Sequence, residues 1–214
     1  MTAARKPTGR PPQFDRDSVL ESATLVFWAH GYEGASLALL TEAMRLSPAS
    51  LYAAFGSKEA LYRETLRRYG GGPTAPADET NGAYRQLERR LKQAAVRFTQ
   101  PGKPPGCMML TGSLRGGADA GGAIAAAAET RAAHLASMVR LFEQAKADDE
   151  LPPDCDPRAL AHFYMAVLQG MSVQAIDGAS VRTLNQIAEQ ALAQWPGKRA
   201  GARKTPRRRA GQAR

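Results

Sequence analysis

Apolar residues recur every three or four positions along most of the chain, which is the spacing of a helix face. The clearest case steps by three, four, three and four from Tyr84 through Leu87, Leu91 and Ala94 to Phe98. The sequence contains no long alternation of β-branched and polar residues, the pattern of a half-buried strand. The pattern therefore predicts an all-α protein.

Capping residues and helix breakers set the expected helix ends. Ser47, followed by Pro48 in the first helical position, starts a helix that Gly56 ends, because glycine takes a positive φ at low cost. Caps at Asp15, Ser36, Ser47 and Ser57 predict N-terminal helices over 16–30, 37–44, 47–55 and 58–69. After the break at 70–73, further helices are expected over 84–98, 119–147, 157–176 and 180–195.

Charge is concentrated at the two ends of the chain. The formal net charge is +9, and residues 198–214 hold eight Lys and Arg with no acid. We expect a basic arm at 1–13, folded domains at 14–70 and 75–196, and a disordered basic tail at 197–214. The tail's composition fits either contact with nucleic acid or a solvated segment that aids solubility.

Several classes of protein are disfavoured by the composition. Two cysteines indicate a reducing cytoplasm rather than a disulfide framework. No apolar run reaches the ~18 residues of a membrane span, so no membrane partner is expected. Enzyme signatures such as HExxH and GxxxxGK[ST] are absent, and Gly112-Ser-Leu-Arg-Gly116 lacks the spacing of a nucleophile elbow. A helical enzyme and a purely structural helical protein remain as alternatives.

Three short helices within residues 15–55 predict a helix-turn-helix unit, which places one helix in the major groove of DNA. The turn over 45–47 joins the second helix to the third, whose outward residues Ser47, Ala49 and Ser50 are small enough for close approach to bases. Tyr52 can reach a phosphate with its hydroxyl, and Lys58 adds a cation at the next helix start. A three-helix core without a DNA role has the same spacing.

Two motifs resemble the TetR family of transcriptional repressors: Ala29-His-Gly-Tyr-Glu-Gly-Ala-Ser36 and Ser47-Pro-Ala-Ser-Leu-Tyr-Ala-Ala-Phe-Gly-Ser-Lys-Glu-Ala-Leu61. This resemblance implies that 14–70 is a helix-turn-helix DNA-binding domain and that 75–196 is an effector-binding and dimerisation domain. It implies a homodimer that binds a palindromic, double-stranded operator and is released by an effector in the C-terminal domain. It implies DNA contacts by Arg10, Ser36, Ser47, Pro48, Ala49, Ser50, Tyr52, Phe55 and Lys58.

The C-terminal half resembles the branch of that family that contains the copper-responsive regulator ComR, on Pro105-Gly-Cys107, Leu151-Pro-Pro-Asp-Cys-Asp156 and Gln169-Gly-Met-Ser172. The resemblance makes copper a candidate effector, since copper(I) favours thiolate, thioether and imidazole ligands. A thiol-based redox or electrophile sensor at Cys107 and an organic-ligand sensor are the alternatives. The candidate metal ligands are Cys107, Cys155 and His162. Candidate pocket residues, which would otherwise fill the core, are Phe98, Cys107, Met138, Phe142, Phe163 and Tyr164.

The last two helices are expected to form the dimer interface as a four-helix bundle, because their apolar stripes need partners. Gly170 and Ala191 would allow close approach of the helices. The predicted stripes are Leu160, Phe163, Val167 and Met171 on one helix, and Leu184, Ile187, Ala191 and Trp195 on the other.

Overall fold

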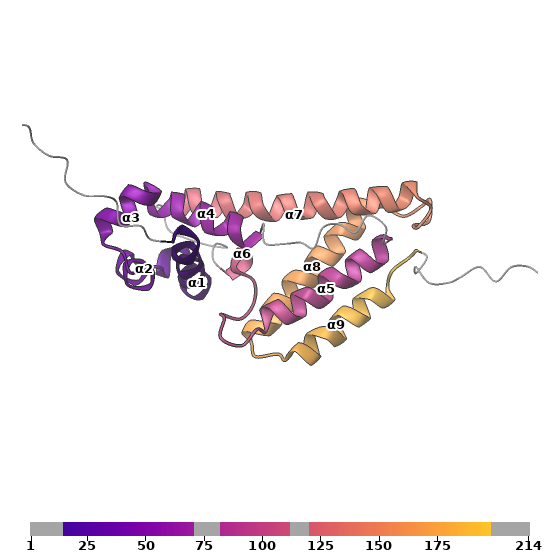
Figure 1. The fold of residues 1–214 in the computed structure, drawn as a ribbon. Coiled ribbons are helices and arrows are strands. Elements are labelled where there is room, and N and C mark those ends of the chain that lie inside the picture. The colour runs from indigo at the N-terminus through magenta and orange to yellow at the C-terminus, as the bar shows by residue number, and fades with distance from the viewer. Residues whose placement is uncertain (1–14, 71–81, 112–119, 198–214) are drawn as a thin grey trace, which may run out of the picture.

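The computed structural model describes residues 15–70, 82–111 and 120–197, and every regular element within them is a helix (Figure 1). The prediction of an all-α fold is confirmed. The predicted arm at 1–13, with Arg10, and residues 198–214 of the predicted tail lie outside the described residues. The helices are α1 (Arg16–Gly34), α2 (Leu37–Met44), α3 (Pro48–Phe55), α4 (Lys58–Gly70), α5 (Ala83–Phe98), α6 (Met108–Thr111), α7 (Gly121–Ala147), α8 (Pro157–Ile176) and α9 (Val181–Ala193).

Helices α1 to α4 form an N-terminal unit whose helix ends follow the capping pattern. Ser36 Oγ accepts a hydrogen bond from Leu39 N at 3.2 Å, and Ser47 Oγ accepts one from Ser50 N at 3.1 Å. Each bond satisfies an N–H group that the first turn of a helix leaves without a partner. Gly31 takes a φ of 69°, so α1 breaks there and adds only a short turn beyond.

The core of the N-terminal unit fixes the orientation of α3. Phe27 of α1 and Tyr62 of α4 are fully buried, with their ring centroids 4.9 Å apart. Leu40 of α2 and Leu51 of α3 are also fully buried in this cluster. Because α3 turns Leu51 inward, its opposite face is directed to solvent.

Helix α7 belongs to both halves of the molecule. Its 27 residues span roughly 40 Å at 1.5 Å per residue, and Figure 1 shows it running along one side from α4 to α8. Ala123 and Ala127 are buried in the N-terminal core with α6, whereas Met138 and Phe142 are buried in the C-terminal core. The hydrophobic cores therefore do not divide at the glycine-rich break after α4.

Helices α5, α8 and α9 pack with the second half of α7 around an aromatic cluster. The centroid of the Phe142 ring lies 5.5 Å from that of Trp195 and 5.9 Å from that of Tyr164. Tyr164 Oη donates a hydrogen bond of 3.1 Å to the carbonyl oxygen of Ala191. This bond satisfies a buried hydroxyl and links α8 to α9.

The outward face of α8 and α9 differs from the one that we predicted. Met171 of α8, Leu184 and Ala191 of α9, and Trp195 just after α9 are buried within the chain, because they pack in the bundle core with α5 and α7. They cannot form the surface of a dimer interface. The exposed face of α8 carries small and apolar residues spaced by four, three, four and three, namely Ala159, Phe163, Ala166, Gly170 and Val173.

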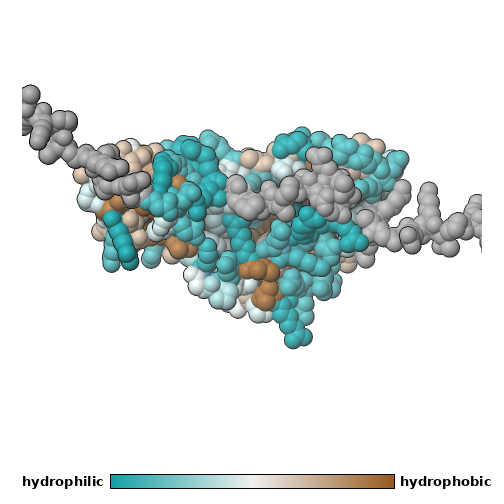
Figure 2. Space-filling view, viewed as in Figure 1, coloured by the Kyte–Doolittle hydropathy of each residue, from teal (hydrophilic) through white to brown (hydrophobic). Residues whose placement is uncertain are grey.

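By length and composition alone, α8 is long and apolar enough to cross a membrane. The sequence analysis did not predict this feature. In the structure α8 packs against α5, α7 and α9 and buries Tyr164 and Met171 among them. Figure 2 shows a mostly hydrophilic face with a compact hydrophobic patch low on the molecule, where Figure 1 places α5, α8 and α9. The apolar composition of α8 thus serves the bundle core on one face.

Candidate nucleic-acid interface and effector pocket

Helices α2 and α3 form a helix-turn-helix. Arg45 ends α2 in the left-handed conformation, with a φ of 53°, and Ser47 then starts α3 from an extended backbone. Most residues predicted to contact DNA lie on the surface of this unit, and the Tyr52 side chain is 46% exposed. Ser36, Ser47, Pro48, Ala49 and Tyr52 are exposed, whereas Ser50 and Lys58 are half-buried.

Phe55 does not belong to this outward face. It is 5% exposed and packs in the N-terminal core, with the Arg16 guanidinium 4.8 Å from its ring centroid. The prediction that Phe55 contacts DNA is therefore wrong for the side chain, because the ring points to the inner side of α3. Its role is to hold α3 in place.

Lys58 stands at the N-terminus of α4, where backbone N–H groups and an ammonium group together attract a phosphate. Its Nζ lies 4.5 Å from the centroid of the Tyr32 ring, a cation–π contact. Burial lowers the pKa of Lys58, and the carboxylate of Glu33 acts in the opposite direction. The Tyr32 ring of α1 therefore positions the ammonium group of the first residue of α4, which follows α3 in the chain.

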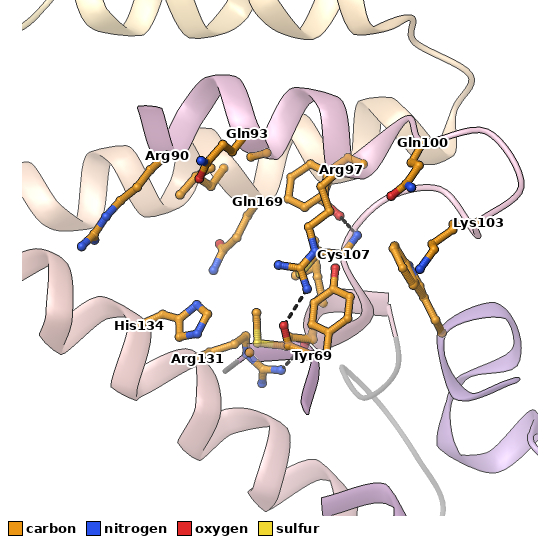
Figure 3. A pocket seen from close by; sticks show the side chains of 18 of the residues that line it. Tyr69, Arg90, Gln93, Arg97, Gln100, Lys103, Cys107, Arg131, His134 and Gln169 are labelled. Carbon is orange, nitrogen blue, oxygen red and sulfur yellow. Dashed lines mark hydrogen bonds between the residues drawn. The ribbon is translucent and has the colours of Figure 1, made fainter. Parts of the chain in front are cut away.

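A pocket of about 860 Å³ lies between the N-terminal unit and the helical bundle (Figure 3). Trp28 of α1 and Tyr69 of α4 line it on one side, and residues of α5, α7 and α8 line it on the other. Its size is within the range of sites for small organic ligands. The apolar part of the lining includes Phe98, Met138, Met165 and Leu168.

Arg97 connects the pocket to the end of α4. Its Nη2 donates a hydrogen bond of 2.6 Å to the carbonyl oxygen of Tyr69, and its guanidinium lies 3.7 Å from the centroid of the Tyr69 ring. Burial, and then the neighbouring Cys107, raise the pKa of the Tyr69 hydroxyl. The Tyr69 ring also packs edge-on against Trp28 of α1, with 5.0 Å between centroids. A change at Arg97 thus reaches both α4 and α1.

Cys107 lines the pocket at the turn that precedes α6. Its backbone N donates a hydrogen bond of 2.8 Å to Ser172 Oγ on α8. Gly106 before it takes a φ of 78°, and a Cβ atom there would lie 2.8 Å from Ile176 Cγ1 and 2.9 Å from the Ser172 carbonyl oxygen. Only glycine fits this approach, which fixes the cysteine against α8.

Comparison with known proteins decides the family. Residues 19–65 match the model of bacterial regulatory proteins of the tetR family, and residues 83–192 match that of the tetracyclin repressor-like C-terminal domain. The chain belongs to the TetR family. It is therefore a DNA-binding transcriptional regulator of the repressor type and not an enzyme, as the sequence predicted.

Individual relatives agree with this assignment. The TetR-family chain is 36% identical over 197 residues to the HTH-type transcriptional repressor ComR of Escherichia coli K12, which covers 90% of this chain and 94% of ComR. It is 40% identical to a cysteine-substituted form of the TetR family regulator CifR, solved with 26-base-pair operator DNA. That match has a TM-score of 0.83 and covers 88% of this chain and 100% of the CifR chain. The predicted resemblance to the ComR branch is confirmed.

The six predicted effector residues of this regulator divide between pocket, core and surface. Phe98, Cys107 and Met138 line the pocket. Phe142 and Tyr164 are fully buried in the bundle core and are not part of the pocket lining. Phe163 is 41% exposed on the outer face of α8, because it neighbours Tyr164 in sequence and therefore points in a different direction.

The predicted metal ligands are not brought together within the chain. The backbone N of Cys107 donates a hydrogen bond to Ser172 Oγ on α8, whereas Cys155 lies just before the first residue of α8. The helical rise places Pro157 and Ser172 roughly 22 Å apart along α8, so the two thiols cannot share an ion. His162 is exposed near the start of α8. Among residues 15–70, 82–111 and 120–197, no three His, Cys, Asp or Glu side chains form a metal-binding group.

The polar residues of the pocket were missed by the sequence analysis. Arg90, Arg97, His134 and Gln169 come from three helices and line the same space (Figure 3). The spacing of seven between Arg90 and Arg97 placed them on one face of α5, but charged residues on a helix usually face solvent. Only the packing of α7 and α8 against α5 makes this face a pocket wall.

Proposed function

We propose that this regulator represses transcription in the cytoplasm as a homodimer on a palindromic operator, and that an effector in the pocket releases it. The observation that carries the proposal is the position of the pocket, which is lined by Tyr69 of α4 and by Arg97 of α5. Helix α4 follows the helix-turn-helix directly. A ligand that changes the contact between these two residues therefore acts on the orientation of α3.

In this proposal, α3 enters the major groove and Tyr52 contacts the DNA backbone. Ser47, Pro48, Ala49 and Ser50 lie close to the base edges. Ser36 caps α2 near one phosphate, and the Lys58 ammonium holds another. The exposure of Tyr52 and the Tyr32 ring under Lys58 support these roles. Arg10, outside the described residues, adds a phosphate contact from the N-terminal arm.

The dimer is proposed to form through the exposed face of α8, together with α9 of each copy. Gly170 has open space around the position of a Cβ atom, so a second helix can approach closely there. Phe163 and Val173 lie on the same face and are more than two-fifths exposed in the single chain. Burial of these side chains against a second copy supplies the driving force.

Release of DNA requires an effector that binds the two conformations of the dimer with different affinity. The pocket supports an organic effector through its size and its apolar lining. The thiol of Cys107 in the pocket wall supports a second candidate, a reactive electrophile or oxidant that modifies this residue. Copper binding by the predicted cysteine and histidine ligands is disfavoured, because these residues lie apart within the chain.

The stoichiometry of the DNA complex tests the proposed dimer. Mass measurement of the complex on a palindromic duplex should give an even number of chains, and a duplex with one half-site should bind far more weakly. Challenge of the complex with N-ethylmaleimide then tests the thiol. Release from DNA that is lost in Cys107→Ser but kept in Cys155→Ser would assign the response to the pocket cysteine. Equal release from both variants would reject it.

A further inference from the structure

The side chains that line the pocket carry an excess of positive charge. Its lining includes five cationic side chains but only one carboxylate, that of Glu21. Lys103 Nζ lies 2.9 Å from this carboxylate and the Arg68 guanidinium lies 3.4 Å from it. Glu21 is therefore already neutralised by two of the cations. The remaining three are Arg90, Arg97 and Arg131.

Two of the three remaining arginines are occupied by backbone carbonyl groups. Arg97 donates to the carbonyl oxygen of Tyr69, and Arg131 donates to that of Met109 at 2.7 Å. Arg90 is different, since no hydrogen bond or ion pair joins it to any other residue that the structure describes. A half-buried guanidinium that has no partner among the described residues lacks, within them, the compensation that buried charges normally have.

The neighbours of Arg90 sharpen this imbalance. Burial lowers the pKa of the Arg90 guanidinium. The pKa of His134 is lowered first by burial and then by the charges of Arg97 and Arg90, which favours the neutral form of this imidazole. In Figure 3, Arg90, Gln169 and His134 border one part of the pocket from α5, α8 and α7. Within the part of the chain that the structure describes, the site thus presents a guanidinium without a partner beside the side chains of His134 and Gln169.

An apolar region adjoins this polar end. Phe98 of α5, Met138 of α7 and Leu168 of α8 line the same pocket. A ligand that fits both parts therefore carries a negative charge at one end and an apolar body at the other. Planar carboxylates match the guanidinium fork with two parallel hydrogen bonds.

We propose that the pocket binds a small amphipathic carboxylate, with its head group on Arg90 beside Gln169 and His134 and its apolar body against Phe98, Met138 and Leu168. This assignment deepens the proposed function, because it rests on the same pocket as the effector site. It names the chemical class of the ligand from charge and shape.

Calorimetric titration without DNA tests this assignment separately from repression. The probes are the straight-chain carboxylates from butanoate to decanoate and 4-phenylbutyrate, each paired with its neutral primary amide. At least one carboxylate should bind ~10-fold or more tightly than its amide, because the amide loses the charge-assisted pair with Arg90. Absence of binding by every carboxylate, or equal binding of the paired amide, would overturn the proposal.

Three substitutions on α5 locate the head group. Arg90→Gln should weaken carboxylate binding ~10-fold or more and abolish the preference over the amide, whereas Arg90→Lys should keep part of it. Arg89→Gln removes the same charge from the neighbouring residue, which does not line the pocket, and should leave affinity unchanged. Equal affinity of wild type and Arg90→Gln would overturn the assignment to Arg90.

Thermal melting and operator binding distinguish a ligand-binding role of Arg90 from a structural one. The unliganded Arg90→Gln protein should melt at the same temperature as wild type or above it, because the substitution removes a half-buried cation that has no partner among the described residues. A lowered melting temperature would instead indicate a structural role and count against the proposal. Carboxylate binding that leaves operator affinity unchanged would support the ligand assignment while contradicting the proposed effector role.

Discussion

The guanidinium of Arg97 both stacks on the Tyr69 ring, 3.7 Å from its centroid, and donates a hydrogen bond of 2.6 Å to the Tyr69 carbonyl oxygen. Tyr69 lies in the last turn of α4, where the helix dipole is negative and favours a cation. One side chain of the pocket wall therefore holds the end of the helix that follows the DNA-binding unit. In the proposed function, this contact is the path by which a ligand in the pocket acts on the DNA-binding unit.

Removal of this contact should loosen the end of α4. Arg97→Gln is expected to lower the free energy of unfolding by ~1–2 kcal/mol, because a cation–π contact and a charge-assisted hydrogen bond are lost. Hydrogen exchange should become faster at the C-terminal amides of α4 but not at those of α9. Arg89→Gln is the matched control, and unchanged exchange in α4 would show that Arg97 does not couple the two parts.

Operator binding should depend on both Tyr52 and Lys58. Tyr52→Ala and Lys58→Ala are each expected to weaken binding without unfolding the protein, because Tyr52 is exposed and Lys58 stands beside α3. Lys58→Ala should also reduce the slope of log affinity against log salt by roughly one, as one phosphate contact disappears. Lys92→Ala on α5 removes an equal charge elsewhere. Unaltered affinity in both variants would rule out the proposed docking of α3.

The dimer interface is best tested by two arginine substitutions with different expected outcomes. Gly170→Arg should give folded monomers that bind the operator poorly, since its surroundings in the single chain are open. Ala191→Arg should instead destabilise the fold by ~3 kcal/mol or more, because Ala191 is 6% exposed within the chain. Light scattering and thermal melting distinguish the two results. An intact dimer of Gly170→Arg would exclude this face of α8.

Stability should fall in acid through the Glu21 cluster. The hydrogen bond from Lys103, with a smaller contribution from Arg68, lowers the pKa of Glu21 in the folded protein. Such a carboxylate stabilises the fold above its unfolded pKa of about 4.3 and loses this contribution as pH falls through the lowered value. The melting temperature of Glu21→Gln should therefore fall less than that of wild type when the pH is lowered below ~4. As a control, Glu189→Gln should show the same dependence of melting temperature on pH as wild type. A curve for Glu21→Gln that runs parallel to the wild-type curve would contradict the role of Glu21.

The basic segment 198–214 should strengthen DNA binding independently of the DNA sequence. Its eight Lys and Arg residues displace counterions from any duplex. Deletion of 198–214 is expected to lower affinity for operator and random DNA by similar factors, and most at low salt. Loss of operator preference with unchanged affinity for random DNA would instead make this segment a sequence reader.

Local sequence signals predicted the helix ends well, because capping depends on residues only a few positions apart. Ser36, Ser47 and Ser180 each cap the expected helix, and Gly56 ends α3 with a φ of 78°. The same signals could not tell which side of α8 and α9 faces outward. Ala191 and Trp195 lie on a clear apolar stripe, but both are buried within the chain.

Pocket residues were predicted only in part for a related reason. Phe98, Cys107 and Met138 line the pocket as predicted. Arg90 and Gln169 also line it, but only because α5 and α8 border the same cavity. Periodicity describes one helix at a time, whereas a pocket depends on the relative placement of several helices. Phe142 and Tyr164 show the reverse case, since aromatic side chains suited to a ligand site fill the core.

Selection of bound sequences from a random duplex library tests most directly whether this protein is an operator-specific dimeric regulator. The purified wild-type chain should enrich one palindrome with two equal half-sites, and footprinting should show protection of both halves. Tyr52→Ala should fail to enrich it at the same protein concentration. Recovery of unselected DNA with no common sequence, or of a single unpaired site, would contradict the assignment of a dimeric, operator-specific regulator.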